Sequence, residues 1–143
     1  MPPIARSFGY RVLSHTAEVI VEIRAENWAE FYRQAACALL TVHSPRPANG
    51  TLRKFRVCID AEGPEEALVS WLNEIIYIVS ARRCLPRKIR IVSAGSNFIE
   101  AVLFGAAFGR EGGIMKEVKA ATYGDLKVRR SAHRIMARVI LDV

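Results

Sequence analysis

Two segments of this chain repeat their apolar residues with the period of an α-helix, and this pattern most limits the folds open to it. The first begins at Asn27, a good N-cap residue, and Glu30 lies three positions later, as in a capping box. Its apolar residues recur at spacings of three and four. The segment should end before Ser44-Pro45, because the residue preceding a proline disfavours the α region.

The second helical segment begins with Pro64 at or near the first helical position, followed by two glutamates that face the positive end of the helix dipole. The pair Arg82-Arg83 suits its C-terminus. Its apolar stripe consists of Leu68, Trp71, Leu72, Ile75, Ile76 and Val79. Both helices are amphipathic, so each is expected to cover one face of a sheet.

The rest of the regular sequence is typical of strands. In residues 17–24, Val19, Val21 and Ile23 share one face, and Glu18 and Glu22 share the other. Further strands are expected at residues 52–60, 88–93, 97–106, 117–123, 126–129 and 135–141. The order β-α-β-α followed by consecutive strands predicts a single α+β domain over residues 1–143. We expect a two-layer sandwich, with a mixed or antiparallel sheet covered by the two helices.

Cysteine usage and hydropathy indicate the compartment. Cys37, Cys58 and Cys84 are odd in number and form no CxxC pair, so we expect reduced thiols packed in or near the core of a protein from a reducing compartment. The most apolar stretch, residues 68–79, is interrupted by Asn73 and Glu74 and cannot span a bilayer. The first eight residues lack the apolar centre of a signal peptide. We therefore expect a soluble, cytoplasmic protein without a membrane partner.

The residue set of a self-sufficient enzyme is missing from the sequence. His15, His43 and His133 show no HxxxH or HxH spacing, and no GxSxG turn presents a serine nucleophile. The glycine-rich residues 105–113 match neither a P-loop nor a GxGxxG turn opening a helix, so we interpret them as a loop between strands. We interpret His15 as a structural hydrogen-bonding residue.

The acidic residues form a more informative pattern. Asp142 is penultimate, so its carboxylate lies one residue from the free α-carboxylate of Val143. Carboxylates this close repel, and a hard cation bound between them would relieve the repulsion. If the first strand lies next to the last, Glu18 would supply a third oxygen ligand. The alternative is that these acids are exposed and paired with neighbouring arginines.

Four short motifs, taken in order, resemble signatures of the archease family. Residues 14–19 read SHTAEV and resemble the family's HTAD-V signature. Residues 71–74 read WLNE and resemble its WLNE-type helix, and residues 119–123 read KAATY and resemble its KAxTY segment. Residues 138–143 are similar to its closing strand, which ends in an aspartate followed by one apolar residue. The matches run from residue 10 to the last residue.

The resemblance implies a non-enzymatic cofactor that activates an RtcB-type RNA ligase in tRNA splicing and RNA repair, by promoting guanylylation of the ligase and its multiple turnover. It also implies a divalent metal ion, often calcium, held by three positions that are Glu18, Asp142 and Val143 in this chain. Glu18 keeps the charge of the family's usual aspartate but moves it about one methylene outward. The important lysine of the KAxTY segment corresponds to Lys119.

The charge of the chain supports a different class of function. Its formal net charge is +7, which favours anionic partners such as tRNA. A basic RNA-binding module that acts without a ligase is therefore the alternative. The basic residues that would follow the phosphates are Arg82, Arg83, Arg87, Lys88, Arg90, Arg129, Arg130, Arg134 and Arg138. A metal-dependent hydrolase that uses the same carboxylates is a further alternative, but it lacks a base or nucleophile beside the ion.

Overall fold

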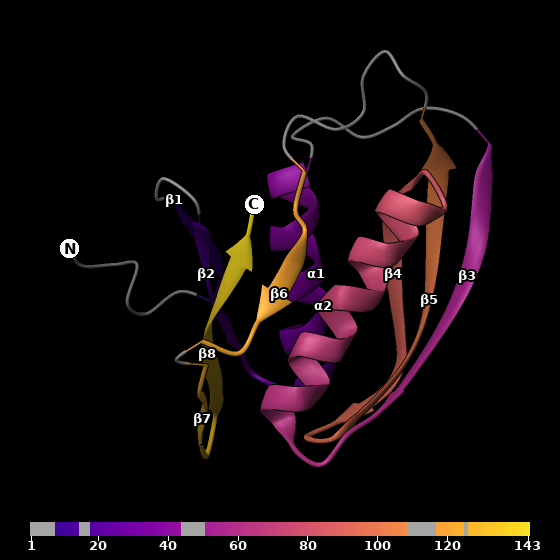
Figure 1. The fold of residues 1–143 in the computed structure, drawn as a ribbon. Coiled ribbons are helices and arrows are strands. Elements are labelled where there is room, and N and C mark those ends of the chain that lie inside the picture. The colour runs from indigo at the N-terminus through magenta and orange to yellow at the C-terminus, as the bar shows by residue number, and fades with distance from the viewer. Residues whose placement is uncertain (1–7, 15–17, 44–50, 109–116, 125) are drawn as a thin grey trace.

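The described residues of the computed structural model form two helices and eight strands (Figure 1). They comprise residues 8–14, 18–43, 51–108, 117–124 and 126–143. The helices are α1 (Trp28–His43) and α2 (Pro64–Ala81). The strands are β1 (Gly9–Ser14), β2 (Glu18–Ala25), β3 (Leu52–Asp60), β4 (Cys84–Gly95), β5 (Phe98–Ala107), β6 (Ala120–Thr122), β7 (Val128–Ser131) and β8 (Arg134–Asp142).

The strands form two antiparallel sheets. The larger sheet has the order β1-β2-β8-β6, and β7 also pairs with β8. The smaller sheet has the order β3-β5-β4. Strand β8 is thus shared: β2 lies along one of its edges, and β6 and β7 follow one another along the other edge.

The helices lie between the two sheets (Figure 1). Helix α1 contacts β2 on one side and β4 on the other, and α2 contacts β6 as well as β3 and β4. The expected α+β class, with two amphipathic helices and antiparallel pairing, is confirmed. The division of the strands into two sheets was not expected, since the sequence pattern predicted one sheet and two layers. Neither helix in the described part of the chain is long and apolar enough to cross a membrane.

The reason for two sheets is the wide apolar surface of α2. Its buried residues are Ala67, Leu68, Val69, Trp71, Leu72, Ile75, Ile76, Ile78 and Val79. This set includes adjacent positions and therefore covers more of the helix circumference than a single stripe. One sheet can cover only one side of such a helix. The second sheet buries the remaining apolar side chains and so completes the core.

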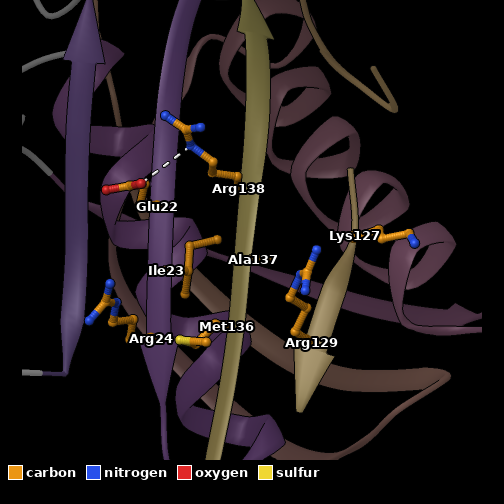
Figure 2. Close-up of a pocket in the computed structure, with 8 residues that line it drawn as sticks. All are labelled: Glu22, Ile23, Arg24, Lys127, Arg129, Met136, Ala137 and Arg138. Atoms are coloured by element: carbon orange, nitrogen blue, oxygen red, sulfur yellow. Dashed lines mark ion pairs between the residues drawn. The ribbon is translucent and has the colours of Figure 1, made fainter. Parts of the chain in front are cut away.

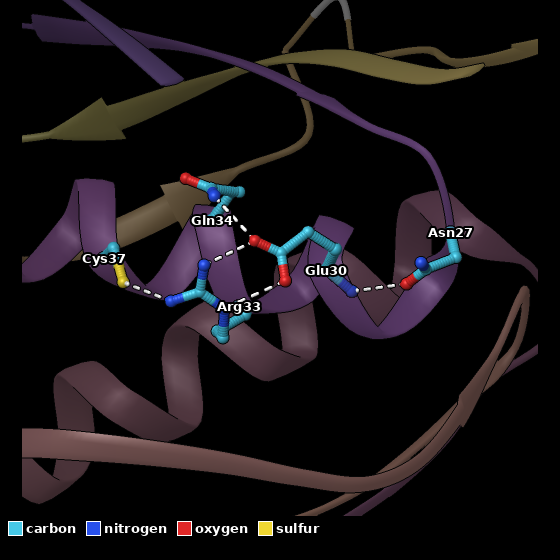
Figure 3. A network of polar contacts seen from close by, with 5 residues as sticks. All are labelled: Asn27, Glu30, Arg33, Gln34 and Cys37. Atoms are coloured by element: carbon cyan, nitrogen blue, oxygen red, sulfur yellow. Dashed lines mark hydrogen bonds and ion pairs between the residues drawn. The ribbon is translucent and has the colours of Figure 1, made fainter. Parts of the chain in front are cut away.

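The predicted helix start at Asn27 is confirmed, and a polar network fixes it (Figure 3). The Asn27 side-chain oxygen accepts a hydrogen bond from the Glu30 backbone N–H at 2.9 Å, which satisfies a donor at the helix N-terminus. The Glu30 carboxylate accepts two hydrogen bonds from Arg33 and one from Gln34. The hydrogen bond from Arg33 is the main cause of the lowered pKa of Glu30. Glu30 is therefore occupied in holding the first turns of α1.

Other boundaries differ from the expectation in specific places. Strand β1 was not predicted, because its Tyr10 and Val12 side chains are exposed and give no core-facing alternation. Strand β5 ends at Ala107, close to the end of the predicted strand at residues 97–106, so Gly105 belongs to the strand and not to the loop expected at residues 105–113. Strand β6 is shorter than the predicted residues 117–123. His15 and most of the glycine-rich stretch lie outside the described residues.

The three cysteine thiols differ in burial, which leads to a prediction about their reactivity. Cys84 is buried and Cys37 is half-buried, whereas Cys58 is exposed, so the expectation that it packs in or near the core was wrong. Burial raises the pKa of the Cys37 and Cys84 thiols, although a nearby arginine partly opposes the effect for each. Because the thiolate is the reactive form, iodoacetamide at pH 8 should modify Cys58 first. Peptide mass spectrometry would show the order, and labelling of Cys84 as fast as Cys58 would contradict it.

Candidate functional site

Glu18 and Asp142 lie directly opposite one another where β2 pairs with the end of β8. Residues in register across an antiparallel pair direct their side chains to the same face, with Cβ atoms about 5 Å apart. Both residues are exposed, while their neighbours Val19 and Leu141 are buried in the core. The alternation of β2 and β8 thus buries one face and directs the two carboxylates outward. The condition set by the sequence, that the first predicted strand lies beside the last, is met.

Lys119 lies on the other side of Asp142. Its backbone N–H donates a hydrogen bond of 2.8 Å to the backbone oxygen of Asp142, and Ala120 is the register partner of Asp142 in β6. The end of β8 is therefore held between two strands. The Lys119 side chain is exposed, and Val143 is half-buried against the core. The structure brings together all four residues that the sequence assigned to a site: Glu18, Asp142, Val143 and Lys119.

Asn73 of helix α2 holds β6 in this position. Its side-chain oxygen accepts a hydrogen bond from the Ala121 N–H at 2.8 Å, and its side-chain nitrogen donates to the Ala121 oxygen at 3.3 Å. Asn73 belongs to the WLNE segment, and Ala121 belongs to the KAATY segment. Two of the sequence motifs are therefore joined by a two-point contact. The presence of an asparagine among the buried apolar residues of α2 was the signal for this supporting role, and sequence reasoning did not use it.

Trp71, in the same motif, connects the two helices. Its side chain is fully buried, and its indole N–H donates a hydrogen bond of 2.9 Å to the Tyr32 backbone oxygen in α1. The Tyr32 hydroxyl in turn donates to the Gly95 backbone oxygen at 2.9 Å. Burial is the main reason that the pKa of Tyr32 is raised, so this hydroxyl keeps its proton. Trp71 and Tyr32 thus fix α2, α1 and the β4–β5 turn relative to one another.

The chemistry of the Glu18–Asp142 pair suits a hard cation. Both groups offer carboxylate oxygens, the ligands that calcium and magnesium prefer, and Val143 is adjacent to Asp142 in the chain. Among the described residues, neither carboxylate takes part in an ion pair, so the alternative of exposed acids neutralised by arginines is not favoured. Within the same residues, no group of three or more histidine, cysteine, aspartate and glutamate side chains is arranged to hold a metal. A bound ion would therefore need ligands beyond these two side chains. The preceding signature residues 15–17 lie outside the described part of the chain.

Further along the outer face of the larger sheet, most charged side chains are basic. Glu22, four residues after Glu18, forms ion pairs with Arg11 of β1 at 3.4 Å and with Arg138 of β8 at 3.3 Å. Beside this triad lies a hollow of about 280 Å³ (Figure 2). It is lined by Glu22, Ile23, Arg24, Lys127, Arg129, Met136, Ala137 and Arg138. Sequence reasoning had named Arg129 and Arg138 as basic residues but had no means to place Arg24 and Lys127 beside them.

Comparison with known proteins reveals relatives over nearly the whole chain. The model of the Archease protein family (MTH1598/TM1083) matches residues 10–143. Protein archease of Methanosarcina acetivorans is 28% identical over 141 residues, covering 94% of this chain and 95% of the relative. Protein archease of Archaeoglobus fulgidus is 26% identical over 136 residues, covering 94% of this chain and 98% of the relative.

Two solved structures share the fold. Protein 1598 of Methanobacterium thermoautotrophicum, solved in solution, has a TM-score of 0.71 at 21% identity, covering 94% of this chain and 99% of that protein. A crystal structure from Thermotoga maritima, described as an archease and possible chaperone, has a TM-score of 0.66 at 23% identity. It covers 93% of this chain and 96% of that protein. The arrangement of helices between two sheets is therefore common to this chain and both proteins.

Proposed function

The chain belongs to the archease family, and from this premise we propose that it activates an RtcB-type RNA ligase as a cofactor without a catalytic step of its own. The observation that carries the proposal is the pairing of Glu18 with Asp142 at the end of the β2–β8 ladder. Glu18 and Asp142 are exposed, lie in register and take part in no ion pair among the described residues, which supports a contact between this charged surface and a partner.

In this proposal the carboxylates of Glu18, Asp142 and the Val143 terminus hold a divalent cation such as calcium. The cation would supply positive charge for the phosphates of the nucleotide that reacts with the ligase. The exposed ammonium group of Lys119 would add a second positive charge from the neighbouring segment. The ladder fixes the positions of Glu18 and Asp142, and the hydrogen bonds of Asn73 fix the segment after Lys119. The chain's own residues thus contribute position and charge, while the ligase performs the chemical step.

The proposal is tested by single-turnover guanylylation of the cognate ligase. Asp142→Ala removes one proposed metal ligand and should lower the stimulation of the ligase on the order of tenfold or more. Asp60→Ala is the matched control, because Asp60 is also an exposed acid at the end of a strand but lies on the smaller sheet. The control should stimulate as the wild type does. Equal stimulation by Asp142→Ala and wild type would remove the acidic pair from the mechanism.

A binding measurement separates the metal from the ligase. Titration of the pure protein with calcium should raise its thermal unfolding temperature, because a ligand that binds only the folded state stabilises it. Asp142→Ala should abolish this shift and Asp60→Ala should keep it. A calcium-independent unfolding temperature in the wild type would contradict the metal part of the proposal. The guanylylation result would then decide whether the acidic pair contacts the ligase directly.

A further inference from the structure

The basic hollow lies on the outer face of the larger sheet, over the part of β8 that has β2 along one edge and β7 along the other. Strand β6 pairs with β8 as far as Ile140, and β7 takes over at Ala137. Lys127 lies between these two paired segments and lines the hollow, and in Figure 2 its ammonium group points away from the other lining residues. The hollow is therefore lined by residues of three neighbouring strands, β2, β8 and β7, together with Lys127.

The charges around the hollow are strongly unequal. Four cationic side chains line it, from four places in the chain: Arg24 of β2, Lys127, Arg129 of β7 and Arg138 of β8. Glu22 is the acidic residue in this lining, and its carboxylate is shared between Arg138 and Arg11, which lies just outside. Lys127 and Arg129 are exposed. The hollow therefore presents a surplus of positive charge to solvent, with Met136 as an apolar contact between the arginines.

The geometry points to a specific anion. We propose that this hollow binds the phosphates of an RNA strand, an inference that rests on the proposed function for the choice of RNA among polyanions. Arginine guanidinium groups match phosphate oxygens in a forked geometry, and phosphate contacts from Arg and Lys dominate the affinity of proteins for nucleic acids. A hollow of about 280 Å³ has room for phosphate and ribose together, and the thioether of Met136 offers the sugar an apolar surface.

The basic surface also continues beyond the hollow, as a strand of RNA requires. Arg134, at the start of β8, shares the outer face of that strand with Met136 and Arg138. Arg130 of β7 lies on the other face, where its guanidinium packs over the Trp28 ring. Repeated phosphates along a chain need repeated cations, whereas a single small anion does not. Arg134 therefore extends the surface beyond a single phosphate position.

The hollow has a defined position relative to the acidic pair. Glu18 and Glu22 are four residues apart on the same face of β2, a separation of about 13 Å along a strand. Glu18 lies in the acidic pair and Glu22 lines the hollow. RNA bound in the hollow would therefore lie on the face that the proposal directs toward the ligase. The activator would contact the RNA substrate as well as the enzyme.

The test measures RNA binding by the pure protein, without a ligase. A fluorescent single-stranded RNA of about 12 nucleotides is titrated at several salt concentrations. The double substitution Lys127→Ala/Arg129→Ala should weaken RNA binding by about tenfold near 0.1 M salt. It should also reduce the slope of the logarithm of the binding constant against the logarithm of the salt concentration by about 1.4, because each lost phosphate contact removes about 0.7 from this slope. Both side chains are exposed, so the fold should be retained, as circular dichroism would verify.

The matched control is Lys88→Ala/Arg90→Ala on β4. It removes the same charge from two exposed residues of the opposite, smaller sheet. The control should bind RNA as the wild type does. An equal loss of affinity in both double variants would show that RNA is attracted by the overall positive charge of the protein, and would contradict a binding site at the hollow. Tighter binding of poly-glutamate than of RNA, at equal charge concentration, would overturn the choice of RNA in favour of an acidic protein. Since no ligase is present, these results are independent of the guanylylation experiment.

Discussion

Replacing Trp71 by alanine is expected to lower the free energy of unfolding by about 3–5 kcal/mol, the cost typical of a large aromatic side chain removed from a core. The side chain is fully buried between the two sheets. Its removal leaves a cavity and deprives the Tyr32 carbonyl of the indole N–H at 2.9 Å. Small domains are stable by only about 5–15 kcal/mol, so the variant should lose much of its stability at 37 °C.

Urea unfolding followed by far-ultraviolet circular dichroism measures this effect. Trp71→Phe keeps most of the apolar contact but removes the donor to the Tyr32 carbonyl, so its loss should be smaller, about 1–3 kcal/mol. Tyr77→Ala is the control on the same helix, because the Tyr77 side chain is 55% exposed. Its effect should stay within about 0.5 kcal/mol. A Trp71→Ala variant as stable as Tyr77→Ala would show that α2 does not pack between the sheets as described.

Replacing Asn73 by alanine is the second change with a large expected effect, about 2–3 kcal/mol. The substitution removes both hydrogen bonds to Ala121 and leaves the N–H and carbonyl of a buried residue without their partner. Unlike the loss at Trp71, this loss should be local. Strand β6 is short and depends on α2 as well as on β8, so the segment from Lys119 onward should loosen before the rest of the protein.

Amide hydrogen exchange distinguishes local loosening from global instability. Asn73→Ala should accelerate exchange at Ala121 and Lys119 far more than at Val21 in β2. Glu74→Ala is the matched control, since Glu74 is the exposed neighbour of Asn73 and should change stability by less than about 0.5 kcal/mol. If exchange in β6 were unchanged in Asn73→Ala, then β8 alone would hold the strand. Reduced stimulation of the ligase by Asn73→Ala would connect this support to the acidic pair.

Local sequence signals predicted the elements that depend on neighbouring residues. The N-cap at Asn27 places the start of α1, Pro64 places the start of α2, and the strand at residues 52–60 has the predicted bounds. These features depend on capping, the fixed φ of proline and alternation, all of which act within a few residues. Strand β1 gave no such signal. It pairs with β2 at the edge of the larger sheet, so its side chains need not alternate between core and solvent.

The sequence could predict the candidate site only on the condition that the strand containing Glu18 lies beside the last strand. The sequence shows that Glu18 lies near one end of a strand and that Asp142 is penultimate, but it does not show that the two strands are neighbours. That adjacency arises from long-range packing, and only the register of β2 with β8 reveals it. The basic hollow was beyond sequence reasoning for the same reason. Arg24 and Lys127 are about a hundred residues apart in the chain, and both line the hollow only because β2 and β7 lie along the two edges of β8.

The position of β8 between β2 and the later strands also sets the order of events during synthesis. The register partners in β2 and β8 are more than 100 residues apart in the chain, so β2 leaves the ribosome long before its partner exists. Until residues 134–142 have been made, the apolar residues Val19, Val21 and Ile23 have an unpaired strand edge beside them. Contacts this distant in sequence slow folding and expose unpaired edges to aggregation. The larger sheet therefore closes only after β8 has been made, and the nascent chain carries the open edge of β2 until then.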